Sequence, residues 1–302
     1  MPERLCLLCV HAHPDDESSK GAGTVARYHA EGVHTVLVCC TGGEEGDILN
    51  PAMDRPEVRH DLHRIRLEEL RRATEVIGYE EVVMLGYRDS GMPDSEANAR
   101  PDCFAAADLD EAVGRLVAEI RRVRPQVVIT YSDDQQGYPH PDHLRVHDVS
   151  VVAFDRAGDA EAYPEAGAPW QPLKLYYTVW SRNRLVAMHE KFLELGLESP
   201  FDERWLERPS QDDRVTTSVD ISGYGDVRRQ ALLAHATQID PDSPFWFGLP
   251  PEVARTVHPF DEYVLARSLV DTDLPEDDLF AGVRQTIGPE VVHSRGSGSL
   301  GN

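Results

Sequence analysis

Residues 5–17 have the sequence LCLLCVHAHPDDE, in which six apolar residues lead directly into two histidines and three acids. The apolar run predicts a β-strand covered on both faces, because it lacks the alternation of a half-exposed strand. Comparable runs lie near residues 33–40, 81–85, 126–131 and 173–179, separated by helical periodicity near 19–31, 59–77, 108–124 and 142–157. Strands that alternate with helices predict an α/β fold, a mostly parallel sheet with helices on both faces.

The second half of the chain has a weaker pattern. It begins after a segment rich in Pro, Gly and Ala near 161–172, with helical periodicity at 182–195 and 224–237 and a strand-like run at 214–221. We expect one domain over 1–285 rather than two: a Rossmann-like core of about 1–160 and an elaborated C-terminal substrate region of about 161–285. Residues 286–302, which include Gly-Ser-Gly-Ser, are expected to form a flexible tail.

The charge balance excludes several classes of partner. The chain has 30 Lys and Arg against 53 Asp and Glu, a net charge of −23. This disfavours nucleic acid and anionic membranes, which bind basic surfaces. The apolar runs are shorter than the roughly 20 residues of a membrane span, and we expect no export signal. An odd number of cysteines, five, favours a reducing cytoplasm over a disulfide framework. Cys6 and Cys9 are expected on opposite faces of one strand, where they cannot easily share a metal.

The residues after the first strand suit a divalent metal. Open parallel sheets bind ligands at the carboxyl ends of their strands, and His11, His13, Asp15, Asp16 and Glu17 follow such an end. Imidazole and carboxylate are ligands of catalytic zinc, and iron(II) accepts the same donors. Asp15 and Asp16 are adjacent, so we expect one to bind the metal and the other to act as a base. The alternative is an acidic loop that caps the next helix.

A second group of polar residues, GYPHPDH at 137–143, follows the fourth predicted strand. Because parallel strands end at the same edge of a sheet, we expect this loop to meet the first one. His140, His143 and His147 each qualify by spacing as a third ligand, and a buried histidine without a metal is the alternative for any one of them. Tyr138 and His140 can donate to an oxyanion or protonate a leaving amine.

The two motifs together, HAHPDDE at 11–17 and PHPDH at 139–143, resemble those of the zinc-dependent deacetylases that act on N-acetylglucosaminyl substrates. The resemblance is closer to their actinobacterial branch, and within it to the mycothiol S-conjugate amidases. It extends along most of the chain through segments at 18–21, 41–44, 48–54, 89–91, 174–177, 235–241 and 279–282. It implies a zinc amidohydrolase with one Zn²⁺ in each chain.

The resemblance also implies roles for individual residues. Zinc is expected to be held by His13, Asp16 and His143, with Asp15 as the general base. His140 is expected to stabilise the oxyanion or to protonate the leaving group.

Further implied roles complete this site. Asp142 is expected to orient His140, with Tyr138 closing over the same oxygen and His11 in a supporting or structural position.

Four residues are implied to bind the substrate. Arg66 and Asp89 are expected at its inositol end, and Lys20 belongs to the amidase version of the pocket. Asp47 stands near the predicted mouth of the site, where a longer Glu is usual in the amidases. The segment SDDQQ at 132–136 also departs from their pattern. Both departures favour a pathway-specific substrate, a mycothiol-tagged metabolite of natural-product biosynthesis, over the detoxification of foreign electrophiles.

The expected reaction is hydrolysis of the amide bond of mycothiol S-conjugates, which yields an N-acetylcysteine S-conjugate and glucosaminyl-inositol. One alternative is an N-acetylglucosaminyl-inositol deacetylase, which uses the same metal and base on a smaller acyl group. A second alternative is a metal-dependent binding module whose catalytic loop is vestigial. The expected partner is a small thiol conjugate, and the sequence leaves the oligomeric state open, a homo-oligomer included.

Overall fold

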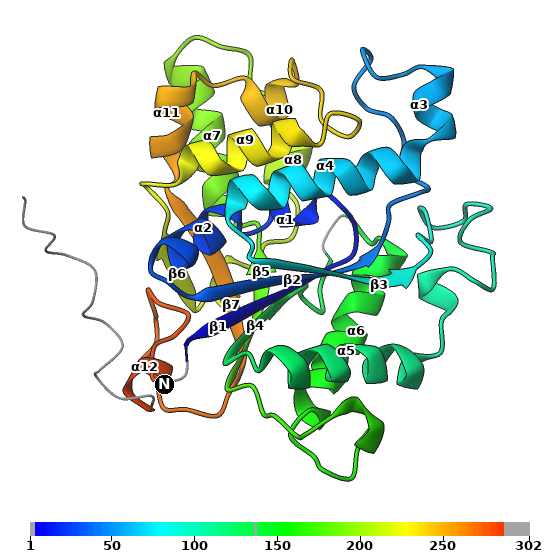
Figure 1. The fold of residues 1–302 in the computed structure, drawn as a ribbon. Helices are drawn as coiled ribbons and strands as arrows, with labels where there is room; N and C mark the ends of the chain where they lie inside the picture. Colours follow the sequence, from blue (N-terminus) through cyan, green and yellow to red (C-terminus); the bar gives the residue numbers. More distant parts are fainter. Residues whose placement is uncertain (1–3, 136–137, 287–302) are drawn as a thin grey trace, which may run out of the picture.

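A seven-stranded sheet forms the centre of the computed structural model, which describes residues 4–135 and 138–286 (Figure 1). Its strands lie in the order β3-β2-β1-β4-β5-β7-β6. The first five strands are parallel, and β7 is antiparallel to both β5 and β6. The strands are β1 (Cys6–His11), β2 (His34–Thr41), β3 (Glu81–Tyr87), β4 (Val127–Thr130), β5 (Lys174–Val179), β6 (Thr217–Asp220) and β7 (Phe260–Ser268). The predicted α/β class with a mostly parallel sheet is confirmed.

Helices cover both faces of the sheet: α2, α4 and α9 lie on one side and α5 and α6 on the other (Figure 1). The helices are α1 (Asp16–Ser19), α2 (Ala22–Ala30), α3 (Pro56–His60), α4 (Leu62–Ile77), α5 (Leu109–Val123), α6 (Pro141–Arg156), α7 (Arg182–Glu194), α8 (Glu203–Leu206), α9 (Gly225–Ala234), α10 (Pro244–Phe247), α11 (Pro251–Val257) and α12 (Val283–Thr286). Among the described residues, none of these helices has the length and apolar character needed to cross a membrane.

Alternate strand residues enter two separate apolar cores, as the two-sided covering requires. Cys6 packs in the core that contains Leu116 of α5, and Cys9 packs in the core that contains Leu70 of α4. The two thiols therefore lie on opposite faces of β1, as expected. All five cysteines are buried and free.

The structure differs from the sequence prediction at several elements. The helix expected over 19–31 begins only at Ala22, as α2, after Gly21 with its positive φ of 87°, and the short helix α1 before it was not expected. The helix expected over 59–77 is divided at Asp61 into α3 and α4. β7 was not predicted, and together with β6 it extends the sheet, so one sheet contains strands from both halves of the chain. The expected tail at 286–302 lies outside the described residues, except for Thr286, which ends α12.

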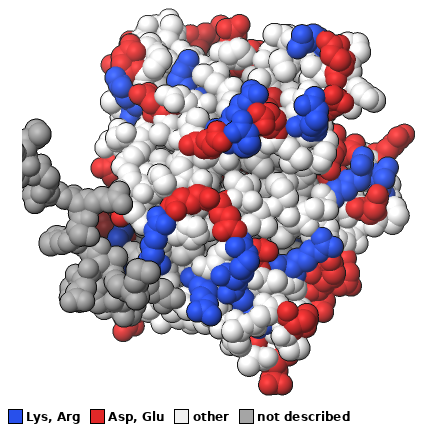
Figure 2. All heavy atoms as spheres, viewed as in Figure 1, with Lys and Arg blue, Asp and Glu red and all other residues white. Residues whose placement is uncertain are grey.

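The surface carries charges of both signs. On the face drawn in Figure 2, Lys and Arg side chains lie among Asp and Glu side chains. Many of these charges are paired, as in the Arg71–Glu68 contact on α4.

Candidate metal centre and active site

The candidate site lies at the carboxyl ends of β1 and β4, which are neighbouring parallel strands. The loop after β1 carries His13 and leads into α1 at Asp16. The segment after β4 leads into α6, where Pro141 occupies the first turn and His140 precedes it as the N-cap residue. Proline suits the first turn because its missing N–H has no partner there in any case. His143 follows within that turn and so faces the first loop.

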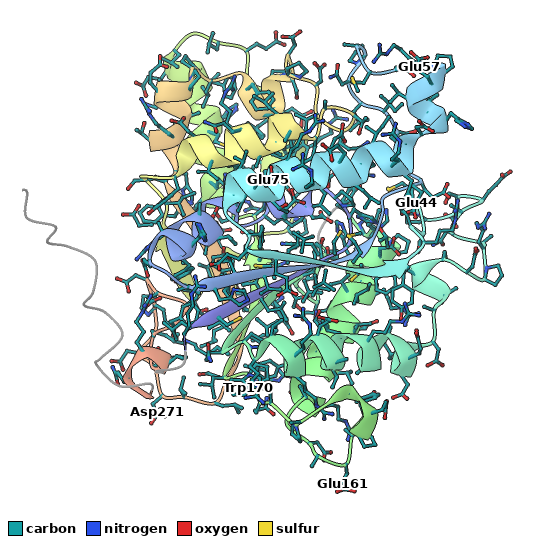
Figure 3. The ribbon with its side chains drawn as sticks, in the orientation of Figure 1. Glu44, Glu57, Glu75, Glu161, Trp170 and Asp271 are labelled. Carbon is teal, nitrogen blue, oxygen red and sulfur yellow. The ribbon has the colours of Figure 1, made fainter. Side chains whose placement is uncertain are left out.

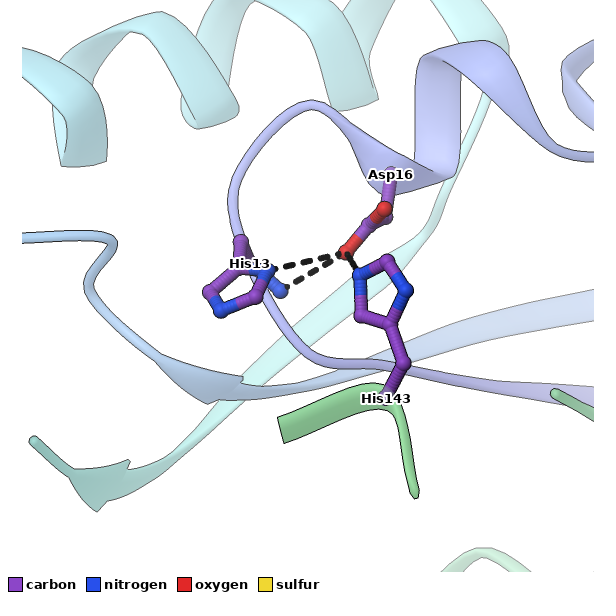
Figure 4. A group of neighbouring side chains, drawn as sticks. All are labelled: His13, Asp16 and His143. Carbon is purple, nitrogen blue, oxygen red and sulfur yellow. Dashed lines mark hydrogen bonds and ion pairs between the residues drawn. The ribbon is translucent and has the colours of Figure 1, made fainter. Parts of the chain in front are cut away.

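His13, Asp16 and His143 bring three buried ligand atoms within 4.8 Å of one another. Asp16 Oδ2 is 3.4 Å from His13 Nδ1 and 3.5 Å from His143 Nε2 (Figure 4). Bonds of about 2.0–2.2 Å to a tetrahedral zinc ion separate neighbouring ligand atoms by about 3.3–3.6 Å. Both distances match that separation, and the donors are of the kind that catalytic zinc uses. These residues therefore fit a divalent metal with a further position left for water.

Asp142 supports His13 from the side opposite Asp16. Its Oδ2 lies 3.1 Å from His13 Nε2 and accepts the Ser90 N–H at 2.9 Å, and Oδ1 accepts the Ser90 hydroxyl. A carboxylate bound to the second nitrogen of a metal-binding histidine is a common arrangement that fixes the ring. This differs from the expectation that Asp142 orients His140. The Asp142 carboxylate is directed to Ser90 and His13, and only its backbone N–H donates to His140 Nδ1, at 3.2 Å.

A second group of three potential ligands, His13, Asp89 and His140, shares one histidine with the first. Asp89 Oδ1 is 3.5 Å from His13 Nε2, the nitrogen already occupied by Asp142. Asp89 also accepts the N–H of Gly91 at 2.8 Å and that of Glu45 at 3.3 Å. These contacts favour the first group as the metal site. Asp89 is buried beside the metal centre, and its N–H donates to Glu44, which is labelled in Figure 3.

The surroundings of Asp16 and His143 shift the pKa values of both side chains toward the forms that bind a cation. Burial raises the pKa of Asp16, but the Lys20 ammonium and His143 outweigh it and hold that pKa well below its usual range. Lys20 Nζ lies 2.5 Å from Asp16 Oδ1. Burial lowers the pKa of His143 to about 4, against the opposing charge of Asp16. Asp16 is therefore ionised and His143 neutral at pH 7, which are the forms that bind metals.

Asp15 has an unusual backbone conformation, with φ 113° and ψ −26°. Its side-chain Oδ2 is 2.9 Å from Arg66 Nη2. Burial raises the pKa of Asp15, while the Arg66 charge lowers it and the Asp16 charge raises it further. Burial raises the pKa of Tyr138, and the nearby carboxylates of Asp16 and Asp15 raise it further. A carboxyl whose pKa rises toward neutrality is better suited to accept a proton.

Arg66 is 3% exposed, and its guanidinium donates hydrogen bonds to other residues of the chain. Besides Asp15, it donates to the carbonyl oxygens of Gly43, at 2.7 Å, and Pro14. The glycine-rich loop after β2 leaves space for the guanidinium, because a Cβ at Gly43 would lie 2.8 Å from Arg66 Nε, inside ordinary contact distance. Arg66 was expected to bind the inositol end of a substrate, whereas its observed contacts hold Asp15 and the two loops.

The rings of His140 and Tyr138 lie next to those of the proposed metal ligands. The His140 ring centroid is 4.5 Å from that of His13, and Tyr138, which is 53% exposed, is 5.6 Å from His143. His147 points elsewhere, with Nδ1 3.1 Å from the Tyr131 carbonyl oxygen. The structure thus selects His143 over His147, a choice that spacing left open. His11 is buried against Tyr131, with ring centroids 5.7 Å apart.

A cleft of about 190 Å³ opens beside His143 and Tyr138. Lys20 forms part of its lining, and Trp180, Trp205 and Arg208 form the wall from the C-terminal region. The Arg208 guanidinium lies 3.9 Å from the Trp205 ring centroid. The expected residue Asp47 is exposed, and its carbonyl oxygen accepts a hydrogen bond from Gln238 at 3.0 Å. The sequence carried no motif signal for the aromatic wall, because its residues come from separate segments that only the fold brings together.

A protein-family model and several known proteins match the sequence of this chain. The family model GlcNAc-PI de-N-acetylase (PIG-L) matches residues 8–154. The chain is 48% identical to the mycothiol S-conjugate amidase of Streptomyces coelicolor, over 94% of this chain and 99% of that protein. It is 42% identical to the 1D-myo-inositol 2-acetamido-2-deoxy-alpha-D-glucopyranoside deacetylase of Streptomyces avermitilis, over 94% and 98%.

Solved structures with the same fold are more distant in sequence. The N,N'-diacetylchitobiose deacetylase of Pyrococcus horikoshii has a TM-score of 0.58 at 18% identity, over 87% of this chain and 84% of that one. The 4-carboxy-2-hydroxymuconate hydratase of Pseudomonas putida KT2440 has the same TM-score and identity, over 89% and 99%. Because one neighbour is a deacetylase and the other a hydratase, the shared fold alone does not determine the reaction.

Proposed function

Because the chain belongs to the GlcNAc-PI de-N-acetylase family, we propose that it is a zinc-dependent amidase that hydrolyses the amide bond of mycothiol S-conjugates. The products are an N-acetylcysteine S-conjugate and glucosaminyl-inositol. The observation that carries the proposal is the 48% identity, over nearly the full length of both chains, to a mycothiol S-conjugate amidase. The lower identity of 42% to an inositol-glycoside deacetylase makes deacetylation the second candidate.

His13, Asp16 and His143 are the proposed metal ligands, supported by their spacing and by the Asp142 carboxylate behind His13. A zinc ion held by these residues would supply Lewis-acid chemistry: it would polarise the amide carbonyl and lower the pKa of the attacking water. Iron(II) accepts the same donors and is the alternative metal.

Asp15 is the proposed general base. Arg66 holds its carboxylate at 2.9 Å, and burial raises its pKa. Asp15 takes a proton from the attacking water, and the oxyanion of the tetrahedral intermediate accepts hydrogen bonds from His140 or Tyr138. Protonation of the amide nitrogen then releases the amine, since a neutral amine leaves more readily than its anion. His140, 6% exposed and close to His13, is the proposed donor for that step.

The substrate is proposed to occupy the cleft next to His143, where Lys20 and Trp205 lie on opposing segments of the chain. Asp89 remains a proposed contact for the polar inositol end, and Asp47 remains a proposed substrate-binding residue near the mouth of the site. The SDDQQ segment at 132–136 favours a bulky, pathway-specific S-substituent, because Ser132, Asp134 and Gln135 line the same cleft. Five buried free thiols support a reducing, cytoplasmic location.

The test is a product assay with the zinc-loaded protein. We expect an S-alkylated mycothiol to yield the thioether-bearing acid and glucosaminyl-inositol in mass spectrometry, faster than N-acetylglucosaminyl-inositol yields acetate. Faster acetate release would replace the proposal by a deacetylase. Saturable zinc binding without turnover of either compound would indicate a binding module. Faster cleavage of a simple alkyl conjugate than of a bulky natural-product conjugate would contradict the biosynthetic role.

A further inference from the structure

Glu17 and His235 form a fully buried ion pair that the mechanism above does not use. His235 Nε2 is 2.7 Å from Glu17 Oε1, and both side chains are 0% exposed. Burial opposes the charged form of His235, but the Glu17 carboxylate outweighs it and raises the pKa of His235. Removing one partner of such a pair leaves the other charged group without compensation in the interior. The pair links α1, beside the metal centre, to the end of α9.

The other oxygen of Glu17 contacts the backbone of the proposed base. Glu17 Oε2 accepts the Asp15 N–H at 2.9 Å. Asp15 has a φ of 113°, in the left-handed half of backbone space. A residue with a side chain is strained in such a conformation and keeps it only where the surroundings enforce it. The hydrogen bond from Asp15 to Glu17 is one such restraint, and the Arg66 contact with the side chain is a second.

His235 is itself held firmly from the C-terminal region. Its carbonyl oxygen accepts the N–H groups of Gln238 and Ile239. Two residues further on, Thr237 donates its N–H and its hydroxyl to the two carboxylate oxygens of Glu69 on α4, at 2.8 and 2.7 Å. Because these contacts anchor the segment without Glu17, a fixed His235 restrains the Glu17 carboxylate.

We propose that His235 and Glu17 are positioning residues that hold the Asp15 backbone in its left-handed conformation and so fix the place of its carboxylate beside the candidate metal centre. The inference rests on the proposed role of Asp15 as base. His235 and Glu17 are 218 residues apart in the sequence. The inference therefore gives the C-terminal region a part in positioning Asp15, in addition to its contribution to the cleft.

The test compares variants of His235 with a matched control. In His235→Ala we expect the kcat of the folded enzyme to fall about 10- to 100-fold, as for other supporting partners of a metal site, with KM and zinc content close to the parent values. The thermal midpoint should fall, because the buried Glu17 charge loses its partner, so kcat is measured well below that midpoint. His235→Gln, which restores a donor to Glu17, should recover part of kcat. His258→Ala removes another His–Glu contact, that to Glu262 at 3.1 Å, and should leave kcat unchanged.

Crystal structures of the variants supply a readout that does not depend on turnover. We expect Asp15 to leave the left-handed region in His235→Ala and to retain it in His258→Ala. An unchanged Asp15 conformation with unchanged kcat would overturn the inference, as would a loss of kcat that parallels loss of zinc or of folded protein. If His235→Ala does not fold, Glu17→Gln decides by the same criteria. Absence of turnover by the parent protein would refute the proposed function alone, and the Asp15 conformation would still decide the inference.

Discussion

Substitution of Gly43 by alanine should disturb both the fold and the base. Gly43 has a φ of +68°, and a Cβ there would lie 2.8 Å from Arg66 Nε, closer still to the end of the guanidinium. Ordinary contacts begin near 3.4 Å. Arg66 therefore has to move, although it is buried and bound to Gly43, Pro14 and Asp15.

Two terms set the size of the effect. A left-handed conformation costs a residue with a Cβ about 1–2 kcal/mol. Overpacking a filled interior costs about 1–3 kcal/mol. Gly43→Ala should thus lower the free energy of unfolding by about 2–5 kcal/mol. Gly32 provides the control, because it has a φ of +86° and nothing within 4 Å of its Cβ position, so Gly32→Ala should incur only the first term.

Urea unfolding followed by circular dichroism measures the free energies, and amide hydrolysis measures kcat. We expect Gly43→Ala to be the less stable variant by about 1–3 kcal/mol and to lose about 10- to 100-fold in kcat through displacement of Arg66 from Asp15. Gly32→Ala should keep the parent kcat. If the two variants have equal stability and equal kcat, Arg66 is not packed closely between Gly43 and Asp15, and this explanation is refuted.

Three further predictions concern the metal, the cleft and the dependence of stability on pH. Asp15→Ala should keep its zinc and lose about 10²- to 10⁴-fold in kcat, while His13→Ala should lose zinc; full metal occupancy of the His13 variant by elemental analysis would contradict the ligand assignment. Trp205→Ala should raise KM with little change in kcat, because it removes a wall of the cleft and no reacting group; a fall in kcat at constant KM would place Trp205 in the chemistry. Burial raises the pKa of Asp278, but Arg284 outweighs it and holds that pKa below its usual range, so Asp278 stabilises the fold above its unfolded pKa and loses that contribution as the pH falls through the folded value. Asp278→Asn should therefore be less stable at pH 7 and should show a smaller stability difference between pH 7 and pH 2; an unchanged difference by urea unfolding would argue against the Arg284 contact as its source.

The sequence predicted those features that depend on neighbouring residues. β1 and the loop carrying His13 and Asp16 follow from an apolar run that ends in a proline-fixed group of metal-binding side chains. The five parallel strands followed in the same way, because each contains a short apolar run without strict alternation of apolar and polar residues. β7 was missed although Phe260–Ser268 contains partial alternation, since an antiparallel strand that joins the sheet late in the chain carries no βαβ signal.

Features that depend on contacts between residues far apart in the sequence could not be predicted from local sequence patterns. Spacing could not separate His143 from His147, because both lie on α6 and only the packing of α6 against β1 and β4 decides which ring meets Asp16. The role of Arg66 depends on the loop after β2, and the Glu17–His235 pair joins residues 218 positions apart. A charged residue in a helix and a histidine at a helix end have ordinary surface explanations until the fold buries them.

The most direct test is a crystal structure with zinc, using anomalous diffraction above and below the zinc absorption edge. The account predicts one strong anomalous peak bonded to His13, Asp16 and His143, with the Asp15 carboxylate outside the bonding distance of the ion and next to a zinc-bound water. A peak between His13, Asp89 and His140, or direct coordination by Asp15, would contradict it.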